Sequence, residues 1–266
     1  MSDLDESNQQ FIAAWQFFAR RAEQGTVEAD RGGVSVAFSN VTAPILNMAF
    51  LATPVATAAD LQARIDRAMA TGAASGRMWM LTVCEDWLPA DVRERAPAMM
   101  AAVGLAPTNV TTGMVTDALA SPRRPVPSEL TIRPADSAAG YRAVADLNMG
   151  AYHMPLEWGH EALARQELFV DGVWADVAYL GDVPVSTSTT VLIDKRLYVM
   201  LVATDAGHTN KGYAEAVMRA SLARASAATK LHRTVLHATP AGAPLYTAMG
   251  YRATSQFTMY MQPPPG

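Results

Sequence analysis

The chain has 266 residues, half of them hydrophobic, which excludes a disordered chain and suffices for one large domain or two small ones. Only 17% of the residues are charged, and a net charge of −4 offers no general attraction to nucleic acid or anionic lipid. The single cysteine, Cys84, cannot form an internal disulfide, and its apolar surroundings indicate a structural role. The polar, acidic first residues do not resemble a signal peptide, and no apolar run approaches membrane-spanning length. We therefore expect a cytoplasmic protein without a nucleic-acid or membrane partner.

The first half of the chain predicts alternating helices and strands. Apolar residues at helical spacing predict a helix over residues 11–19. Thr57 and Asp60 have the spacing of a capping box, which begins a helix that ends at Gly72 and Gly76. Strands are expected at residues 34–39, 45–53, 78–83 and 109–115, and a further helix at 90–103.

The segment SPRRPVPSE, residues 121–129, is rich in proline and poor in apolar residues, so it is predicted to link two domains. Beyond it we expect a strand at 130–136, helical stretches at 137–152 and 155–169, strands at 173–180, 183–193 and 195–204, a long helix, a strand at 233–238, a short helix at 243–249, a strand at 251–261 and a tail at 263–266. The predicted domains are residues 1–120 and 130–262, and the predicted class is α+β with a mixed, mostly antiparallel sheet flanked by helices.

In the second half, one apolar strand runs through a polar loop directly into an amphipathic helix. A helix start carries unpaired N–H groups and the positive end of the helix dipole, and Gly212 would let a phosphate approach the backbone. Lys211 adds a cation, and Thr209 and Asn210 add short polar groups. The sequence contains neither a P-loop nor a three-glycine dinucleotide motif. The junction therefore indicates another kind of phosphate loop, with an ordinary helix entry as the alternative.

The spacing of Thr209, Gly212 and Ala214 resembles the acyl-coenzyme A loop of the GNAT N-acetyltransferase superfamily, usually Gln/Arg-x-x-Gly-x-Gly/Ala. Thr209 departs from the usual Gln or Arg. A second segment, APLYTAMGY at residues 243–251, is similar to the final helix of the family with its Leu-Tyr-x-x-x-Gly-Phe/Tyr ending. The order of elements after residue 130 also matches the GNAT fold. The resemblance covers residues 130–261.

This resemblance implies an acetyl-CoA-dependent N-acetyltransferase, with acetyl-CoA as co-substrate and a small-molecule amine as acceptor. The pantetheine arm would pair with the strand like an added strand, and the diphosphate would lie on the loop. The residues that the resemblance assigns to the coenzyme are Val202, Ala203, Thr204, Thr209, Asn210, Lys211, Gly212, Tyr213 and Ala214. Backbone N–H groups near Val202 would stabilise the oxyanion, and Tyr246 would protonate the departing thiolate as general acid.

Two histidines are candidates for the general base, because an imidazole accepts a proton near neutral pH. His237 ends the strand before the final helix. His153 lies with Glu157 and His160 in YHMPLEWGHE, which the resemblance places beside the acceptor. Packing or surface roles for these histidines are the alternative. The spacing of the three fits no recognised zinc pattern, so no metal site is expected.

The acceptor side is assigned to Tyr152, Glu157 and Trp158, with core packing as the alternative for the aromatic residues. Two other functions remain open on the sequence. One is a non-catalytic acyl-CoA-binding regulatory protein, which the departure at Thr209 favours. The other is a protein or peptide N-acetyltransferase. The sequence also leaves a homodimer open.

An internal repeat relates the two halves of the chain. AAVGLAPT at residues 101–108 parallels TAMGYRAT at 247–254, and LAT before the helix of Leu61 parallels VAT before the helix of Val217. In both halves these landmarks are roughly fifty residues apart, the scale of a repeated supersecondary unit. Met100 stands in the place of Tyr246, and LATPVATAADL has no glycine or lysine. Residues 31–119 are therefore predicted to be a degenerate, partial GNAT-like domain, with chance similarity as the alternative.

Overall fold

The computed structural model describes residues 1–263, so the predicted tail at 263–266 lies almost wholly outside the described residues. Contacts divide the chain into two units. The first contains Met1–Gly113, Ala238–Ala241 and the described residues 253–263, and the second contains Met114–His237 and Gly242–Arg252. The segment predicted as a linker thus belongs to the second unit. The last strand, which the sequence groups with residues 130–262, has most of its residues in the first unit.

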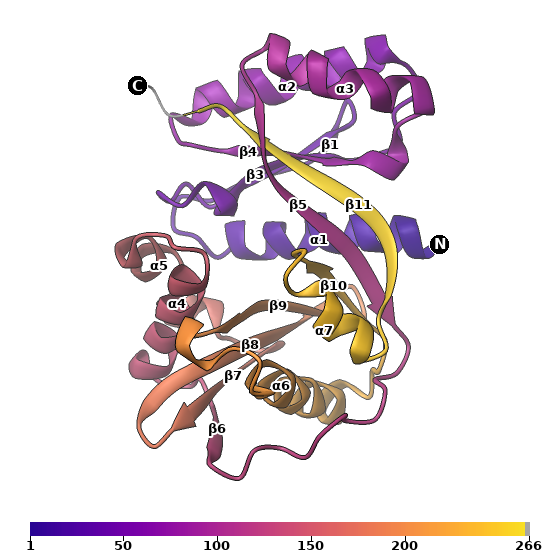
Figure 1. Cartoon of the computed structure of the whole chain (residues 1–266). Coiled ribbons are helices and arrows are strands. Elements are labelled where there is room, and N and C mark those ends of the chain that lie inside the picture. The colour runs from indigo at the N-terminus through magenta and orange to yellow at the C-terminus, as the bar shows by residue number, and fades with distance from the viewer. Residues whose placement is uncertain (264–266) are drawn as a thin grey trace. The chain divides into compact units, whose positions relative to one another are not determined.

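The first unit contains a mixed sheet with the strand order β1-β2-β3-β4-β11-β5 (Figure 1). Its strands are β1 (Thr26–Arg31), β2 (Val34–Phe38), β3 (Asn47–Leu51), β4 (Met80–Cys84), β5 (Ala106–Thr116) and β11 (Arg252–Met261). Strands β1, β2 and β3 are antiparallel neighbours, whereas β4 runs parallel to β3 and antiparallel to β11.

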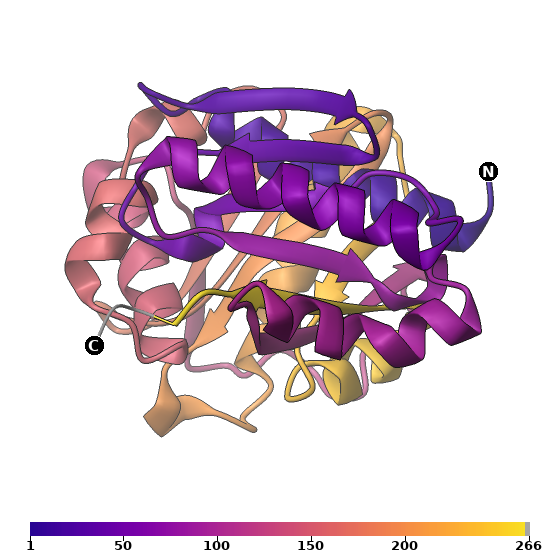
Figure 2. The same ribbon diagram turned by 90° about the horizontal axis from the view of Figure 1, so that it is seen from above.

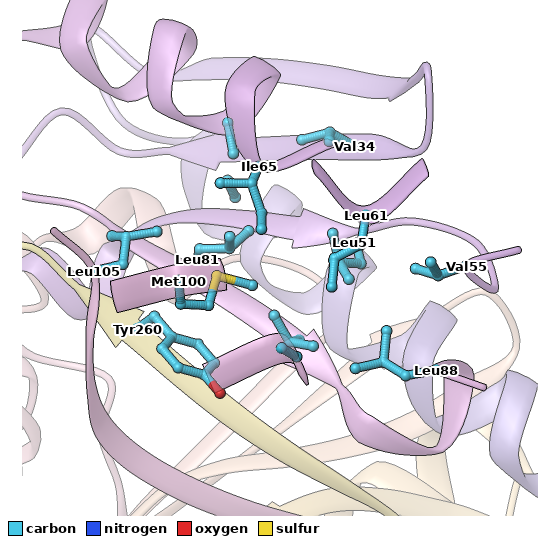
Figure 3. Packing of buried hydrophobic residues seen from close by; sticks show 14 of the residues in the cluster. Val34, Leu51, Val55, Leu61, Ile65, Leu81, Leu88, Met100, Leu105 and Tyr260 are labelled. Atoms are coloured by element: carbon cyan, nitrogen blue, oxygen red, sulfur yellow. The ribbon is translucent and has the colours of Figure 1, made fainter. Parts of the chain in front are cut away.

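Helices cover both faces of this sheet. They are α1 (Asp3–Ala19), α2 (Ala58–Ser75) and α3 (Ala90–Ala102). Alternate residues of a strand point to opposite faces, and Ala49 and Leu51 of β3 belong to the core under α2 and α3, which Figure 3 shows from close by. Met48 and Phe50 belong to the core under α1. Figure 2 shows α2 and α3 on the same side of the strands.

The packing of β11 explains why the last strand belongs to the first unit. It pairs with β4 from Phe257 opposite Cys84 to Tyr260 opposite Leu81. The Phe257 ring lies edge-on to the Phe11 ring of α1, with centroids 5.2 Å apart, and Tyr260 lies in the opposite core. Both faces of β11 therefore fill the cores of the first unit.

Cys84 at the end of β4 is buried, and its Sγ accepts a hydrogen bond from Asn8 Nδ2 at 3.3 Å. Burial raises the pKa of the Cys84 thiol to about 11. Because the thiolate is the nucleophilic form, this thiol is poorly suited to nucleophilic chemistry at neutral pH. The structure is consistent with the structural role that we expected.

The second unit contains strands in the order β10-β9-β8-β7-β6. They are β6 (Leu130–Pro134), β7 (Val173–Leu180), β8 (Val183–Ile193), β9 (Arg196–Thr204) and β10 (Thr234–Ala238). The neighbours from β6 to β9 are antiparallel, and β10 runs parallel to β9. Both units thus contain an antiparallel series, a helix, and then a strand parallel to the last strand of the series. The internal repeat of the sequence stays a prediction.

The helices of the second unit are α4 (Ala138–Ala151), α5 (Leu156–Ala162), α6 (Tyr213–Thr229) and α7 (Ala243–Ala248). Val144 of α4 packs with Val177 and Ala203 on one face of the sheet. Val217 of α6 packs with Ala178 and other residues on the other face. Figure 1 shows α5 beside α4. The α+β class with a mixed sheet flanked by helices is confirmed.

Three details differ from the sequence prediction. Strand β1 was not predicted, because it is a charged, largely exposed strand without a clear apolar alternation. Helix α1 begins at Asp3, with Ser2 as its N-cap. The sequence did not predict this early start, because buried polar residues in the first turns conceal the helical periodicity. The predicted helical stretch over 155–169 is wrong beyond Ala162. There the chain leaves the helix and forms only a 3₁₀ turn at Gln166–Leu168.

Candidate functional site

Strand β9 is bulged near its end. Its antiparallel register with β8 shifts between the pair Met200–Thr189 and the pair Ala203–Thr187, so that β9 holds one extra residue there. Leu201 lies in this stretch with a φ of 51°. A non-glycine residue in that conformation costs about 1–3 kcal/mol and is held only by its surroundings. The bulge therefore redirects the backbone of Leu201 and Val202, where the stretch that the resemblance assigns to the coenzyme arm, Val202 to Thr204, begins.

On its other side β9 leaves its partner early. The parallel ladder with β10 runs from Leu197–Thr234 to Val199–Leu236, whereas β9 continues to Thr204. Among the described residues, the β9 edge beyond Val199 thus lies outside this ladder. Its backbone groups are suited to pairing with an extended ligand, as an added strand would pair.

The loop after β9 is held by its own side chains. Asp205 accepts hydrogen bonds from the backbone N–H of Gly207 at 3.0 Å and pairs with His208 Nδ1 at 2.7 Å. This bond from His208 holds the pKa of the Asp205 carboxyl below its usual range. Thr209 Oγ1 donates to Ala206 O at 3.5 Å, so this hydroxyl is directed to the loop itself. His208 and Asp205 therefore shape the loop.

Gly212 forms the N-cap of α6 in a left-handed conformation, with a φ of 87°. The first helical N–H groups, those of Tyr213, Ala214 and Glu215, lie too early in the helix to have an intrahelical acceptor. The carboxylate of Glu215 does not cap them either: it accepts from Arg219 Nε at 2.9 Å, one turn further on. The N-terminus of α6 thus retains donors and a positive dipole for an anion, with Lys211 exposed beside it.

A cation that we did not predict lies at the same place. A Cβ on Gly212 would be 3.0 Å from Cδ of Arg124 and 3.7 Å from its Nη1, so this side chain lies directly over the glycine. The segment that carries it is fastened at both ends, by Tyr213 OH donating to Glu129 Oε1 at 3.1 Å and by Arg219 Nη2 donating to Ala120 O at 2.8 Å. Two arginines between prolines, Arg123 and Arg124, were the only indication in the sequence of a cation at this place. A proline-rich segment, however, usually indicates a linker.

Tyr246 lies in α7 with only 8% of its surface exposed. Burial raises its pKa above the usual range of a phenol, and the nearby Tyr152 and Tyr251 add to this effect. Its ring centroid is 6.0 Å from that of Tyr251, whose hydroxyl accepts from Thr234 Oγ1 at 2.7 Å. Tyr246 therefore keeps its proton at neutral pH, as a general acid must before the reaction.

The structure brings Tyr152 and Tyr246 near each other, since they interact electrostatically. Tyr152 follows α4 and is 53% exposed as a residue, yet burial around its hydroxyl raises its pKa. Tyr152 thus presents an aromatic surface to solvent close to Tyr246.

His237 is half-buried near the end of β10, with its imidazole shielded from solvent. Its Nδ1 forms a hydrogen bond of 2.8 Å with Tyr198 OH, and burial lowers the pKa of the imidazole to about 3. The ring is therefore neutral at pH 7 and a weak base. The role of His237 as general base stays a prediction that this environment disfavours.

The other candidates lie at the junction of α4 and α5. His153 is exposed with a φ of 53°, Glu157 is exposed and Trp158 is half-buried. His160 Nε2 lies 2.5 Å from Asp146 Oδ1, which fastens α5 to α4. The roles of His153, Glu157 and Trp158 stay predictions. Within residues 1–263, no three His, Cys, Asp or Glu side chains gather as a metal site would require.

Over the same range, none of the helices combines the length and apolar character needed to cross a membrane.

Comparison with known proteins places the fold. No protein-family model and no curated protein matches the sequence. Among solved structures, a GCN5-related N-acetyltransferase from Kribbella flavida matches with a TM-score of 0.69 at 17% identity, over 98% of this chain and 96% of that one. A tandem GNAT protein from the clavulanic acid biosynthesis pathway gives 0.52 at 13% identity, over 84% of this chain and 77% of its own. A GCN5-related N-acetyltransferase from Sphaerobacter thermophilus gives 0.55 at 11% identity, over 86% and 76%. The chain therefore has the fold of the GNAT N-acetyltransferases, in a two-domain form.

Proposed function

We propose that this protein is an acetyl-CoA-dependent N-acetyltransferase that transfers the acetyl group to a small-molecule amine by direct attack on the thioester. The observation that carries the proposal is the sequence of features along one stretch of the second unit. A bulged strand edge outside its ladder leads into a loop, and the loop ends in an open helix N-terminus at Gly212. An extended arm followed by a diphosphate is the ligand whose chemistry matches that order.

In this proposal the pantetheine arm lies along the β9 edge from Val202 to Thr204. The diphosphate accepts hydrogen bonds from the first N–H groups of α6, with Lys211 and Arg124 as nearby cations. The amine nitrogen attacks the carbonyl carbon, the C–N bond forms and the C–S bond breaks. Tyr246 gives its proton to the departing sulfur, and a proton released by the amine restores the phenol.

The test is to mix the protein with acetyl-CoA and a panel of small amines and to measure free thiol. We expect amine-dependent thiol release and saturable coenzyme binding by calorimetry. Coenzyme binding without turnover across a broad panel would overturn the enzyme and leave the alternative, a non-catalytic acyl-CoA-binding regulatory protein. Absence of both binding and turnover would overturn both proposals.

One observation favours that alternative. Thr209 directs its hydroxyl to Ala206 O within the loop, where members of the family usually have Gln or Arg. The calorimetric and thiol measurements separate the two functions, because only the enzyme consumes acetyl-CoA.

A further inference from the structure

A buried amide on α4 contacts the strained part of β9. Asn148 is only 2% exposed, and its Nδ2 donates to Val144 O within the helix at 2.8 Å and to Leu201 O at 3.4 Å. Leu201 is the bulge residue with the positive φ. Both N–H groups of the Asn148 amide thus donate to backbone carbonyls. The bond to Leu201 O holds β9 at the residue where the strand departs from regular geometry.

This contact fixes the direction of a peptide group. Peptide bonds are planar, and none of those described in the chain is cis. In a planar trans peptide the C=O of one residue and the N–H of the next point in opposite directions. Because the Leu201 carbonyl points to Asn148, the Val202 N–H points away from α4. It does so in the stretch of β9 that lies beyond the β10 ladder.

We infer that Asn148 is a positioning residue of the acyl site: by holding the Leu201 carbonyl, it aims the Val202 N–H at the carbonyl oxygen of the bound thioester. This inference rests on the proposed function and names the residue that sets the oxyanion donor. Asn148 acts through the backbone and does not itself touch the substrate. A backbone donor works as an oxyanion stabiliser only if its direction is fixed before the reaction, because reorientation during the reaction weakens it.

The experiment compares Asn148→Leu, which keeps the approximate shape without a donor, with Asn148→Asp and with Val144→Ala. Val144 is buried in α4 one turn earlier, so its truncation loosens the same helix without removing the contact to Leu201. With acetyl-CoA and the best amine of the panel, we expect Asn148→Leu to lower kcat about 10-fold or more while KM for acetyl-CoA changes less than about 3-fold. Val144→Ala should lower the melting temperature and keep kcat.

Asn148→Asp adds a pH signature. A carboxylate cannot donate to Leu201 O, whereas the protonated acid can. The kcat of this variant relative to the parent protein should therefore rise as the pH falls through the pKa of the new carboxyl group. If Asn148 had a purely structural role, the ratio of the two kcat values would not change with pH as long as the variant stays folded.

A second readout needs no turnover. In the parent protein, the Val202 amide proton should shift in the NMR spectrum on addition of acetyl-CoA, and shift much less on addition of CoA, which has no thioester carbonyl. Asn148→Leu should lose the difference while still binding both ligands. An unchanged kcat together with an unchanged Val202 response in Asn148→Leu would overturn the inference and leave the proposed function standing. A parent protein that binds no acetyl-CoA would overturn both.

Discussion

The helices α2 and α6 begin in opposite ways, although each follows a strand of the same type in its own unit. Both carry a carboxylate in the first turn that pairs with an arginine four residues on, Asp60 with Arg64 and Glu215 with Arg219. In α2 the side chain of Thr57 accepts from Asp60 N at 3.1 Å, and Asp60 Oδ2 accepts from Ala56 N at 2.9 Å.

The start of α2 thus has a capping box of its own, in which side-chain oxygen atoms accept from Asp60 N and Ala56 N. At α6 the N-cap is Gly212, and Glu215 turns away to Arg219. A side chain thus caps the start of α2, whereas among the described residues no side chain caps the start of α6. That residues 31–119 are a degenerate copy stays a prediction, and coenzyme binding by the second unit stays part of the proposed function.

The largest expected effect concerns Tyr246, whose place Met100 takes in the first unit. Tyr246→Phe should lower kcat about 100- to 10,000-fold while acetyl-CoA still binds, because the general acid is lost. Burial raises the pKa of Tyr246, so the parent protein should keep the acid form, and not lose it to deprotonation, up to and beyond pH about 10. The pH dependence of thiol release checks both points. Tyr251→Phe, which removes a neighbouring buried hydroxyl, is the control, and equal activity of Tyr246→Phe and the parent would contradict the assignment.

A side-chain cap on α6 like that of α2 should abolish the difference between the two helices. In Gly212→Asp a carboxylate would stand at the N-cap, as oxygen atoms do in α2, and would repel a diphosphate. Loss of two charge-assisted hydrogen bonds, about 3 kcal/mol, corresponds to about a 100-fold rise in the Kd for acetyl-CoA. Aspartate tolerates a positive φ better than most residues, which preserves the fold. Calorimetry measures the Kd, and Gly207→Ala in the same loop serves as control. Unchanged affinity would show that the diphosphate lies elsewhere.

A smaller effect should sharpen the role of the proline-rich segment. Arg124→Ala should raise the Kd for CoA about 10-fold, because one charge-assisted contact is lost. The loss should shrink as salt is added. Arg123→Ala removes the same charge one residue earlier and is the matched control. If the two variants weaken binding equally, only the general charge of the segment matters and the position of Arg124 over Gly212 does not.

The smallest effect should be confined to α2, the helix of the first unit that Thr57 caps. Thr57→Ala should lower the free energy of unfolding by about 1 kcal/mol and leave coenzyme binding unchanged.

In the same helix, the hydrogen bond from Arg64 holds the pKa of Asp60 below its usual range. The stabilisation that Asp60 gives to the folded protein is therefore complete above the ordinary pKa of a carboxyl group. It is lost as the pH falls through the lowered pKa of Asp60 in the folded protein. Thermal melts from neutral to acid pH should show a weaker acid dependence in Asp60→Asn, and an identical acid limb would refute this account.

Features that depend on neighbours along the chain could be predicted from the amino-acid sequence. Hydrophobic periodicity gave most helices and strands, and Gly212 marked the helix start that needs a left-handed residue. The capping spacing of Thr57 and Asp60 also appears in the structure. These features follow from local backbone conformation, so a few consecutive residues suffice to specify them.

Features that depend on distant partners required the tertiary structure. It paired β11 with β4, laid Arg124 over Gly212 and joined Asn148 to Leu201, residues that are 53 positions apart. It also desolvated the imidazole of His237, which lowers its pKa and makes it a weak base, as the sequence could not tell. The physical reason is that strand partners, side-chain contacts and pKa values are set by packing and desolvation, and these depend on which segments meet.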